Sequence, residues 1–187
     1  MDFWEAVKGR RSIRRYRSEP VDDETILKVL EAARYAPSAR NSQPWKFIVV
    51  RRRETLQKLS QIHEWASFLS KAPAGIVCLA DTRLSPRRFP LDVSCAIENM
   101  LLAAHALGLG ACWIAVYGVN TVESEEKVRA IMGIPKDFRI IAIVALGWPA
   151  ETPGPKSLRP VEEVVYWEEF KACLLYTSDA ADDGESV

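Results

Sequence analysis

Five arginines stand close together near the N-terminus, in the segment GRRSIRRYRSEP. They are Arg10, Arg11, Arg14, Arg15 and Arg17. On a helix, Arg10, Arg14 and Arg17 would share one face, where like charges repel by roughly a few tenths of a kcal/mol per pair. An anion opposite them would remove that cost, because the paired N–H donors of guanidinium groups match phosphate oxygens. Ser12 adds a neutral donor. The segment is therefore either a solvated charged face or a socket for one small anion.

A second polar stretch, APSARNSQPWKF, occupies residues 36–47 and leads into an apolar run. Its hydrogen-bonding side chains are those of Ser38, Arg40, Asn41, Ser42 and Gln43, and Pro37 and Pro44 limit its flexibility. Rigid polar loops at the edge of a strand are a common place for ligand contacts, and an ordinary capped turn needs fewer polar groups. We therefore expect this loop to bind a ligand.

No side-chain catalyst or metal site stands out in the sequence. His105 falls in an apolar helix and is expected to be structural, whereas His63 falls on a polar helix face and is expected to be exposed. The sequence has no HExxH motif, no clustered Cys/His pattern, no GxGxxG motif and no Walker A loop. If the protein is an enzyme, a cofactor supplies the difficult chemistry.

The composition is that of an ordinary globular protein, with 48% hydrophobic residues in a chain of 187. The 25 basic and 25 acidic side chains balance, which argues against a nucleic-acid-binding protein because such binding depends on neutralising many phosphates. The cysteines are widely spaced in apolar runs and are expected to be reduced and buried. No apolar run approaches the ~20 residues of a membrane span, and the start of the chain lacks the order of a signal peptide. We expect a cytoplasmic protein.

Hydrophobic periodicity predicts helices that alternate with buried strands. Helices are expected at 2–10, 21–38, 54–65, 91–110 and 121–135, and strands at 46–51, 75–81, 111–118 and 138–148. Residues 82–90 form an expected exposed loop, and 161–170 a last strand or short helix. This pattern predicts one domain over 1–170, with helices around a central sheet. The acidic segment 171–187 has no core to complete, so we interpret it as a cloning or read-through appendage or as a disordered tail.

The helix at 91–110 is apolar around much of its circumference. Its stripe consists of Val93, Ala96, Ile97, Met100, Ala104 and Leu107, and Leu101 and Leu102 add apolar groups outside it. A helix of this kind is buried on more than one side. Since a chain of this length could cover one face, a second subunit is expected to cover the other.

Four segments together resemble the nitroreductase family of flavin-dependent oxidoreductases. RRSIRRY is similar to the R-R-S-x-R-x-[FY] start of that family, and PSARNSQPWKF is similar to its P-S-x-x-N-x-Q-P-W-x-F loop. GLGACWI follows a long apolar helix, as the family's G-L-G-x-x-W segment does, and LGWPAETPGPKSLRPVEEVVYW resembles its closing stretch. The resemblance spans about residues 3–170 in the right order, so the combination is far more specific than any one motif.

The resemblance implies an α+β fold with a central mixed sheet flanked by helices, in an intertwined homodimer. It implies FMN at the subunit interface and two-electron transfer, by a ping-pong route, from NADH or NADPH to a small-molecule acceptor such as a nitroaromatic compound or a quinone. Carried over by position, the phosphate and ribityl contacts would be Arg10, Arg11, Ser12 and Arg14. Pro37, Ser38 and Asn41 would approach the flavin from the partner subunit, and Trp113, Ile114 and Ala115 would line its ring system.

One departure from the family pattern concerns the last phosphate contact. Where the second residue of a basic pair is expected, PKSLRP places Leu158, so Lys156 and then Arg159 are the candidates for the phosphate contact.

The choice of electron acceptor would be set by the loops around 65–73 and 82–90, where Arg87, Arg88 and Phe89 could reach a substrate. The alternatives are another flavin reaction on the same fold, such as reductive dehalogenation or flavin destruction, and a non-enzymatic anion-binding domain.

Overall fold

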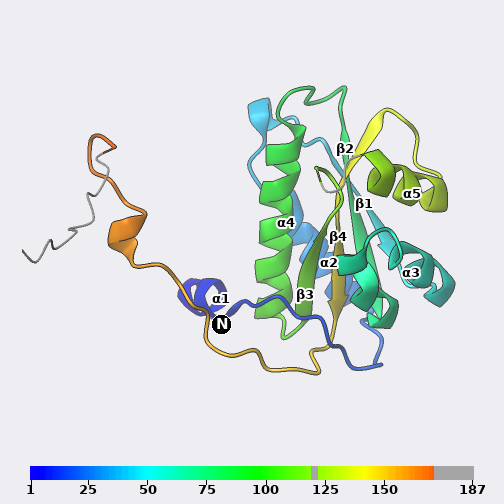
Figure 1. Ribbon diagram of the computed structural model, residues 1–187, viewed down its shortest axis with the longest axis horizontal. Coiled ribbons are helices and arrows are strands. Elements are labelled where there is room, and N and C mark those ends of the chain that lie inside the picture. Colours follow the sequence, from blue (N-terminus) through cyan, green and yellow to red (C-terminus); the bar gives the residue numbers. More distant parts are fainter. Residues whose placement is uncertain (119–121, 171–187) are drawn as a thin grey trace, which may run out of the picture. The chain divides into compact units, whose positions relative to one another are not determined.

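The computed structural model describes residues 1–118 and 122–170 (Figure 1). The chain forms two units, Met1–Gly154 and Pro155–Val187. The first holds the sheet and the long helices. In the described part of the second, a 3-10 turn at Val161–Glu163 stands where a strand or helix was expected, and Tyr166 packs on Phe170 with ring centroids 4.3 Å apart. The single domain predicted over 1–170 stays a prediction for residues 155–170, and the tail at 171–187 lies outside the described residues.

The core of the first unit is a four-stranded sheet in the order β1-β2-β4-β3. The strands are β1 (Trp45–Val50), β2 (Ala74–Asp81), β3 (Gly110–Ala115) and β4 (Phe138–Gly147). Each starts within one residue of its predicted position, because apolar and β-branched runs favour strands. All three strand pairings are antiparallel, so the α+β class is confirmed but the expected mixed sheet is corrected. Among the described residues, parallel pairing is a single bridge between Ser12 and Ala111.

Helices cover both faces of the sheet. They are α1 (Phe3–Gly9), α2 (Asp23–Arg34), α3 (Arg53–Leu59), α4 (Phe89–Ala106) and α5 (Val122–Met132), with 3-10 segments η1 (Ala39–Asn41) and η2 (Glu64–Lys71). Ile76 and Cys78 of β2 join the core that includes α2 and α4, whereas Val77 and Leu79 join the core that includes α3 and η2. This is the alternation expected of a strand buried on both faces. Figure 1 shows α4 on one side of the sheet and α3 and α5 on the other.

The apolar helix α4 differs from its prediction at both ends. It begins at Phe89, so the predicted loop over 82–90 ends two residues earlier, and Phe89 itself is buried at 8% exposure. Leu107 follows the last turn and is 37% exposed, so it does not continue the buried stripe. The rest of the stripe is buried as expected, and so is Leu101. Among the helices of the described residues, none has the length and apolarity to cross a membrane.

Candidate functional site

The arginine segment is extended rather than helical beyond residue 9. Arg10 ends α1 with φ −56° and ψ 132°, and the Ile13 N–H then donates to the Ala111 carbonyl at 3.0 Å. The segment therefore lies along β3. This approach requires Gly110, because a Cβ there would stand 2.7 Å from the Ile13 side chain. The expectation that Arg10, Arg14 and Arg17 share a helix face is wrong, since long-range pairing with β3 sets the backbone.

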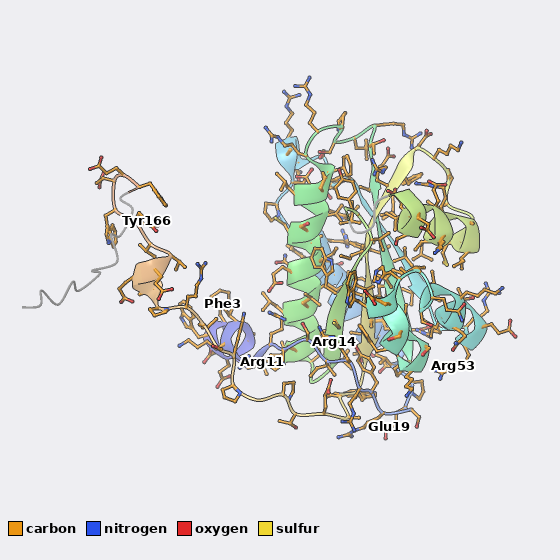
Figure 2. The ribbon with its side chains drawn as sticks, viewed as in Figure 1. Phe3, Arg11, Arg14, Glu19, Arg53 and Tyr166 are labelled. Carbon is orange, nitrogen blue, oxygen red and sulfur yellow. The ribbon has the colours of Figure 1, made fainter. Side chains whose placement is uncertain are left out.

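The arginines have different surroundings in this extended segment. Arg10 lies 3.5 Å from the Glu98 carboxylate, and Arg11 donates to the carbonyls of Lys8 and Arg10. The Arg14 guanidinium lies 5.8 Å from the centre of the Phe68 ring and has no acidic partner in the described part of the chain. Figure 2 shows Arg11 next to α1 and Arg14 farther along the segment. Arg14 is therefore the guanidinium best placed to meet an anion.

Glu151 holds the backbone on which Arg14 stands. Its Oε1 accepts the N–H groups of Arg14 at 2.6 Å and Arg15 at 3.1 Å, and the Ala150 N–H donates to the Arg15 carbonyl. Hydrogen bonds to a charged group are stronger than those between neutral groups. Glu151 belongs to the closing stretch of the family resemblance, but its part in fixing the arginine segment was not anticipated.

A groove of about 510 Å³ lies between β3 and η2, next to Arg14. One wall is β3, from Cys112 to Ala115, and the other includes Trp65 and Phe68 of η2. The groove brings together four residues that the sequence nominated: Arg14, Trp113, Ile114 and Ala115. Burial raises the pKa of the Cys112 thiol, and the neighbouring Arg14 charge and Ser12 hydrogen bond oppose that rise. Ser12 is therefore close to Cys112, which lines the groove, although Ser12 itself is not among the lining residues.

His63 also lines this groove, although we expected it to be exposed. Its ring is half-buried, with Nε2 2.9 Å from the Ala115 carbonyl oxygen. Because a carbonyl only accepts, Nε2 carries the proton, and a neutral ring then leaves Nδ1 as an acceptor. Nδ1 is buried and has no hydrogen-bond partner within residues 1–118 and 122–170. A buried polar atom without a partner is costly, so Nδ1 is an unsatisfied atom next to the groove.

The polar loop after α2 is held in a strained conformation. Arg40, Asn41 and Gln43 have φ values of 56°, 55° and 46°, and left-handed non-glycine residues cost roughly 1–3 kcal/mol each. The Gln43 N–H donates to Ser38 Oγ at 3.0 Å, and the Ala39 N–H donates to Asp92 Oδ1 at 2.9 Å. Strain of this kind gathers at binding sites, which agrees with the ligand contact expected of this loop.

Within one chain, the strained loop does not line the groove, and it lies at the other end of α4 from the start of the arginine segment. The loop is bound to Asp92 in the first turn, whereas Gly9 packs against His105 in the last turn. A helix rises about 1.5 Å per residue, which separates these two positions by about 20 Å. The structure therefore does not bring Pro37, Ser38 and Asn41 to the groove within one chain, and their flavin contacts stay a prediction that requires a partner subunit.

The remaining predicted site residues lie elsewhere. Phe89 is in the first turn of α4, with its ring 5.7 Å from Tyr117, so the expectation of an exposed loop position is wrong for it. Arg87 is exposed and lines a separate pocket. Lys156 and Arg159 are exposed residues of the second unit, and their phosphate contacts stay predictions.

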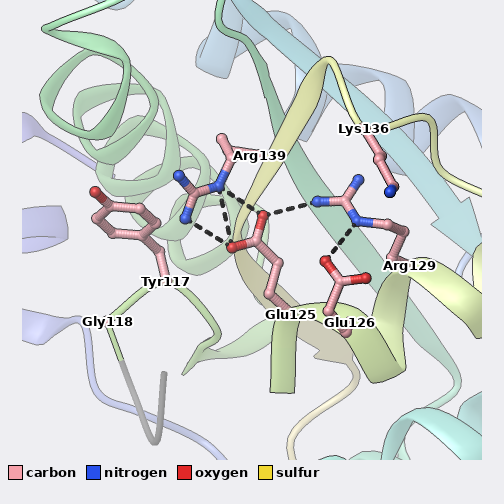
Figure 3. Close-up of a pocket in the computed structure, with 7 residues that line it drawn as sticks. All are labelled: Tyr117, Gly118, Glu125, Glu126, Arg129, Lys136 and Arg139. Atoms are coloured by element: carbon pink, nitrogen blue, oxygen red, sulfur yellow. Dashed lines mark hydrogen bonds and ion pairs between the residues drawn. The ribbon is translucent and has the colours of Figure 1, made fainter. Parts of the chain in front are cut away.

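A larger pocket, of about 640 Å³, is lined by side chains that satisfy one another (Figure 3). The Glu125 carboxylate accepts from Arg129, from Arg139 and from the Ile140 N–H at about the same distance, 2.9–3.1 Å. Arg129 also donates to the carbonyls of Ile134 and Pro135. These groups tie α5 to β4, which makes this cluster structural.

Comparisons with known proteins show the family and the fold of the chain. The profile of the Nitroreductase family matches residues 7–82 and 63–148. A protein of Methanothermobacter thermautotrophicus, provisionally named NADH dehydrogenase/NAD(P)H nitroreductase, is 42% identical over 160 residues, which are 84% of this chain and 83% of that one.

Two solved structures share the fold. One is a protein of Parabacteroides distasonis with the same provisional name, with a TM-score of 0.84 and 33% identity over 89% of this chain and 97% of that one. The other is a provisionally named nitroreductase of Desulfovibrio desulfuricans in complex with FMN, with a TM-score of 0.75 and 32% identity over 89% and 96% of the two chains. This chain belongs to the nitroreductase family.

Proposed function

We propose that the protein is an FMN-dependent oxidoreductase that transfers two electrons from NADH or NADPH to an acceptor such as a nitroaromatic compound or a quinone. The observation that supports this most is the groove beside β3, where Arg14 meets Trp113, Ile114 and Ala115. Family membership and a relative crystallised with FMN point to the same cofactor.

The residues of the groove fit the chemical parts of FMN. Arg14 has no acidic partner in the described part of the chain, and it suits the phosphate, with Ser12 nearby as a neutral donor. The aromatic walls at Trp113 and Phe68 suit a planar ring system.

The chain itself would bind, orient and shield the reacting groups. When bound, FMN would supply the two-electron redox chemistry that links the nicotinamide to the acceptor. Arg14 adds positive charge at the groove, which favours an anionic group bound there. Glu151 keeps Arg14 in place, and the hydrogen bond from His63 to Ala115 fixes the end of β3. With the redox chemistry assigned to FMN and the binding to the chain, the sequence needs no evident catalytic side chain.

A homodimer would complete the site. The loop with Pro37, Ser38 and Asn41 would reach the groove of the partner subunit, since it does not line the groove of its own chain. Phe3 and Trp4 of α1 are 67% and 64% exposed. Large exposed aromatic side chains are typical of protein interfaces, so α1 is the proposed edge of the subunit contact.

Steady-state kinetics test the proposed activity. We expect oxidation of NADH or NADPH with both a quinone and a nitroaromatic acceptor, with the parallel double-reciprocal lines of a ping-pong route, and with FMN recovered intact after many turnovers. If both acceptors are inert, the proposed reaction is wrong. Loss of FMN during turnover would support a flavin-destroying reaction instead, and a colourless protein with steeply salt-dependent anion binding would support the non-enzymatic alternative.

A further inference from the structure

A second pocket lies where the strained loop meets the N-terminal end of α4. Its volume is about 430 Å³, and its lining includes Arg40 from η1 together with Arg87 and Arg88 from the segment before α4. All three side chains are exposed. In the described ranges, 1–118 and 122–170, none of the three guanidinium groups has an ion pair or a hydrogen bond. Figure 1 shows η1, in light blue, beside the first turns of α4.

Within the described residues, the three pocket arginines lack the acidic partners that Arg83 has on the segment before α4. Arg83 donates to both carboxylate oxygens of Asp81 and lies 3.5 Å from Asp137. The three pocket arginines have no comparable partner. They also stand at the positive end of α4, a helix of 18 residues with Arg88 at its cap position. Asp92 is the acidic residue in that first turn, and its single charge leaves the pocket positive.

Asp92 makes the pocket walls rigid. It is 5% exposed, its Oδ1 accepts the Ala39 N–H at 2.9 Å, and its Oδ2 accepts the Ser85 hydroxyl at 2.6 Å. One buried carboxylate therefore joins the loop that carries Arg40 to the segment that carries Arg87 and Arg88. Like charges held together in this way cost stability in the absence of an anion, and a preformed site binds its ligand at a lower entropic cost.

We propose that this pocket binds the phosphomonoester group of one of the enzyme's two substrates. A phosphomonoester carries a charge of about −1.5 to −2 near neutral pH and three acceptor oxygens, which three guanidinium groups can match. The inference rests on the proposed function, which names the substrates. Two substrates carry such a group. NADPH, as the electron donor, has a 2′-phosphate, and free FMN, as an electron acceptor, has its own phosphate. NADH and riboflavin are the matching molecules without that phosphate.

The test compares each pair of substrates on the FMN-loaded enzyme. The quantities are the kcat/KM ratio of NADPH to NADH with a quinone acceptor, and that of free FMN to riboflavin with NADH as the donor. One variant is Arg87→Gln/Arg88→Gln. The other is Arg40→Gly, in which glycine accepts the φ of 56° without strain. The control, Arg34→Gln/Arg53→Gln, removes the same charge from α2 and α3.

We expect one of the two ratios to be large in the wild type and to fall about tenfold or more in both pocket variants, as the loss of charged hydrogen bonds predicts. The control should leave both ratios unchanged. Inorganic phosphate should compete with the phosphorylated substrate in the wild type and not in the variants. Ratios near one in the wild type, or ratios that the variants leave unchanged, overturn the proposal. A failure of the proposed function would give a different result, because the protein would then hold no flavin or show no activity with NADH.

Discussion

Arg14 differs from the neighbouring arginines in what its side chain meets. Arg10 has a carboxylate and Arg11 has backbone carbonyls, whereas Arg14 lies over Phe68 at the edge of the groove. The sequence could nominate the cluster, because five arginines so close together need an explanation. It could not rank them, because their separation depends on the extended pairing of Ser12 with Ala111.

Replacing Arg14 with alanine is expected to weaken FMN binding by roughly 1–3 kcal/mol, the cost of losing a charged hydrogen bond. The measurement is a titration of apoprotein with FMN, followed by the quenching of flavin fluorescence. Arg15→Ala is the matched control and should keep the affinity of the wild type. Equal affinities for all three proteins would refute the phosphate contact assigned to Arg14.

His63 makes a long-range contact that local sequence patterns did not predict. Its polar neighbours in sequence predicted an exposed side chain, yet its Nε2 bonds the Ala115 carbonyl from more than fifty positions away in the chain. Asp92 and Glu151 are similar, because each joins segments that are distant in sequence. Local patterns therefore nominated the arginine segment and the strand at 111–118, which meet at the groove, while the residues that hold such segments in place became visible only in the fold.

At the scale of elements, two local arrangements hold segments against the sheet. Gly110 begins β3 and lets the arginine segment approach it, and Glu125 ties α5 to the start of β4. The strands were predicted within one residue at their starts because apolar, β-branched runs are distinctive. The start of α4 was predicted less well, since Phe89 follows two arginines and a proline that favour a loop.

Gly110→Ala should push the segment with Arg14 away from β3, because the new Cβ would stand 2.7 Å from Ile13. Overpacking of this kind costs about 1–3 kcal/mol, so both the free energy of unfolding and the FMN affinity should fall. Urea denaturation and FMN titration are the measurements. Gly154→Ala, where a Cβ meets no atom within 4 Å, is the control. If the two variants behaved alike, the close approach at Gly110 would have no importance.

Glu125→Gln should lower the free energy of unfolding by about 3 kcal/mol, because it leaves two arginines without their buried carboxylate. The Glu125 side chain is 7% exposed. Glu126→Gln is the matched control, since Glu126 also pairs with Arg129 but is 54% exposed, and exposed pairs contribute about 1 kcal/mol or less. Urea denaturation of both variants measures the difference, and equal losses would contradict the structural role given to Glu125 in Figure 3.

At the scale of the whole molecule, the two polar motifs lie too far apart along α4 to form one site in one chain. A second copy would supply the missing half, and the exposed aromatic side chains of α1 give that contact a starting point. Family membership fixed the general architecture from the motifs alone. The resemblance in sequence implied a homodimer, which the separation of the motifs along α4 supports and which stays a prediction.

Trp4→Asp should therefore weaken the dimer and reduce the amount of bound FMN together, because the flavin site would lose the partner's loop. Sedimentation velocity at several protein concentrations and the flavin content of the same samples are the measurements. Lys58→Asp, on the exposed side of α3, is the control and should leave both unchanged. A monomeric wild-type protein that keeps one FMN per chain would contradict the shared site.

The central claim is that the groove beside β3 holds FMN, and the visible spectrum of the purified protein tests it most directly. We predict a yellow protein with flavin absorbance, which on denaturation releases FMN in an amount close to that of the chains. A colourless protein that still takes up no flavin after incubation with FMN would contradict the claim.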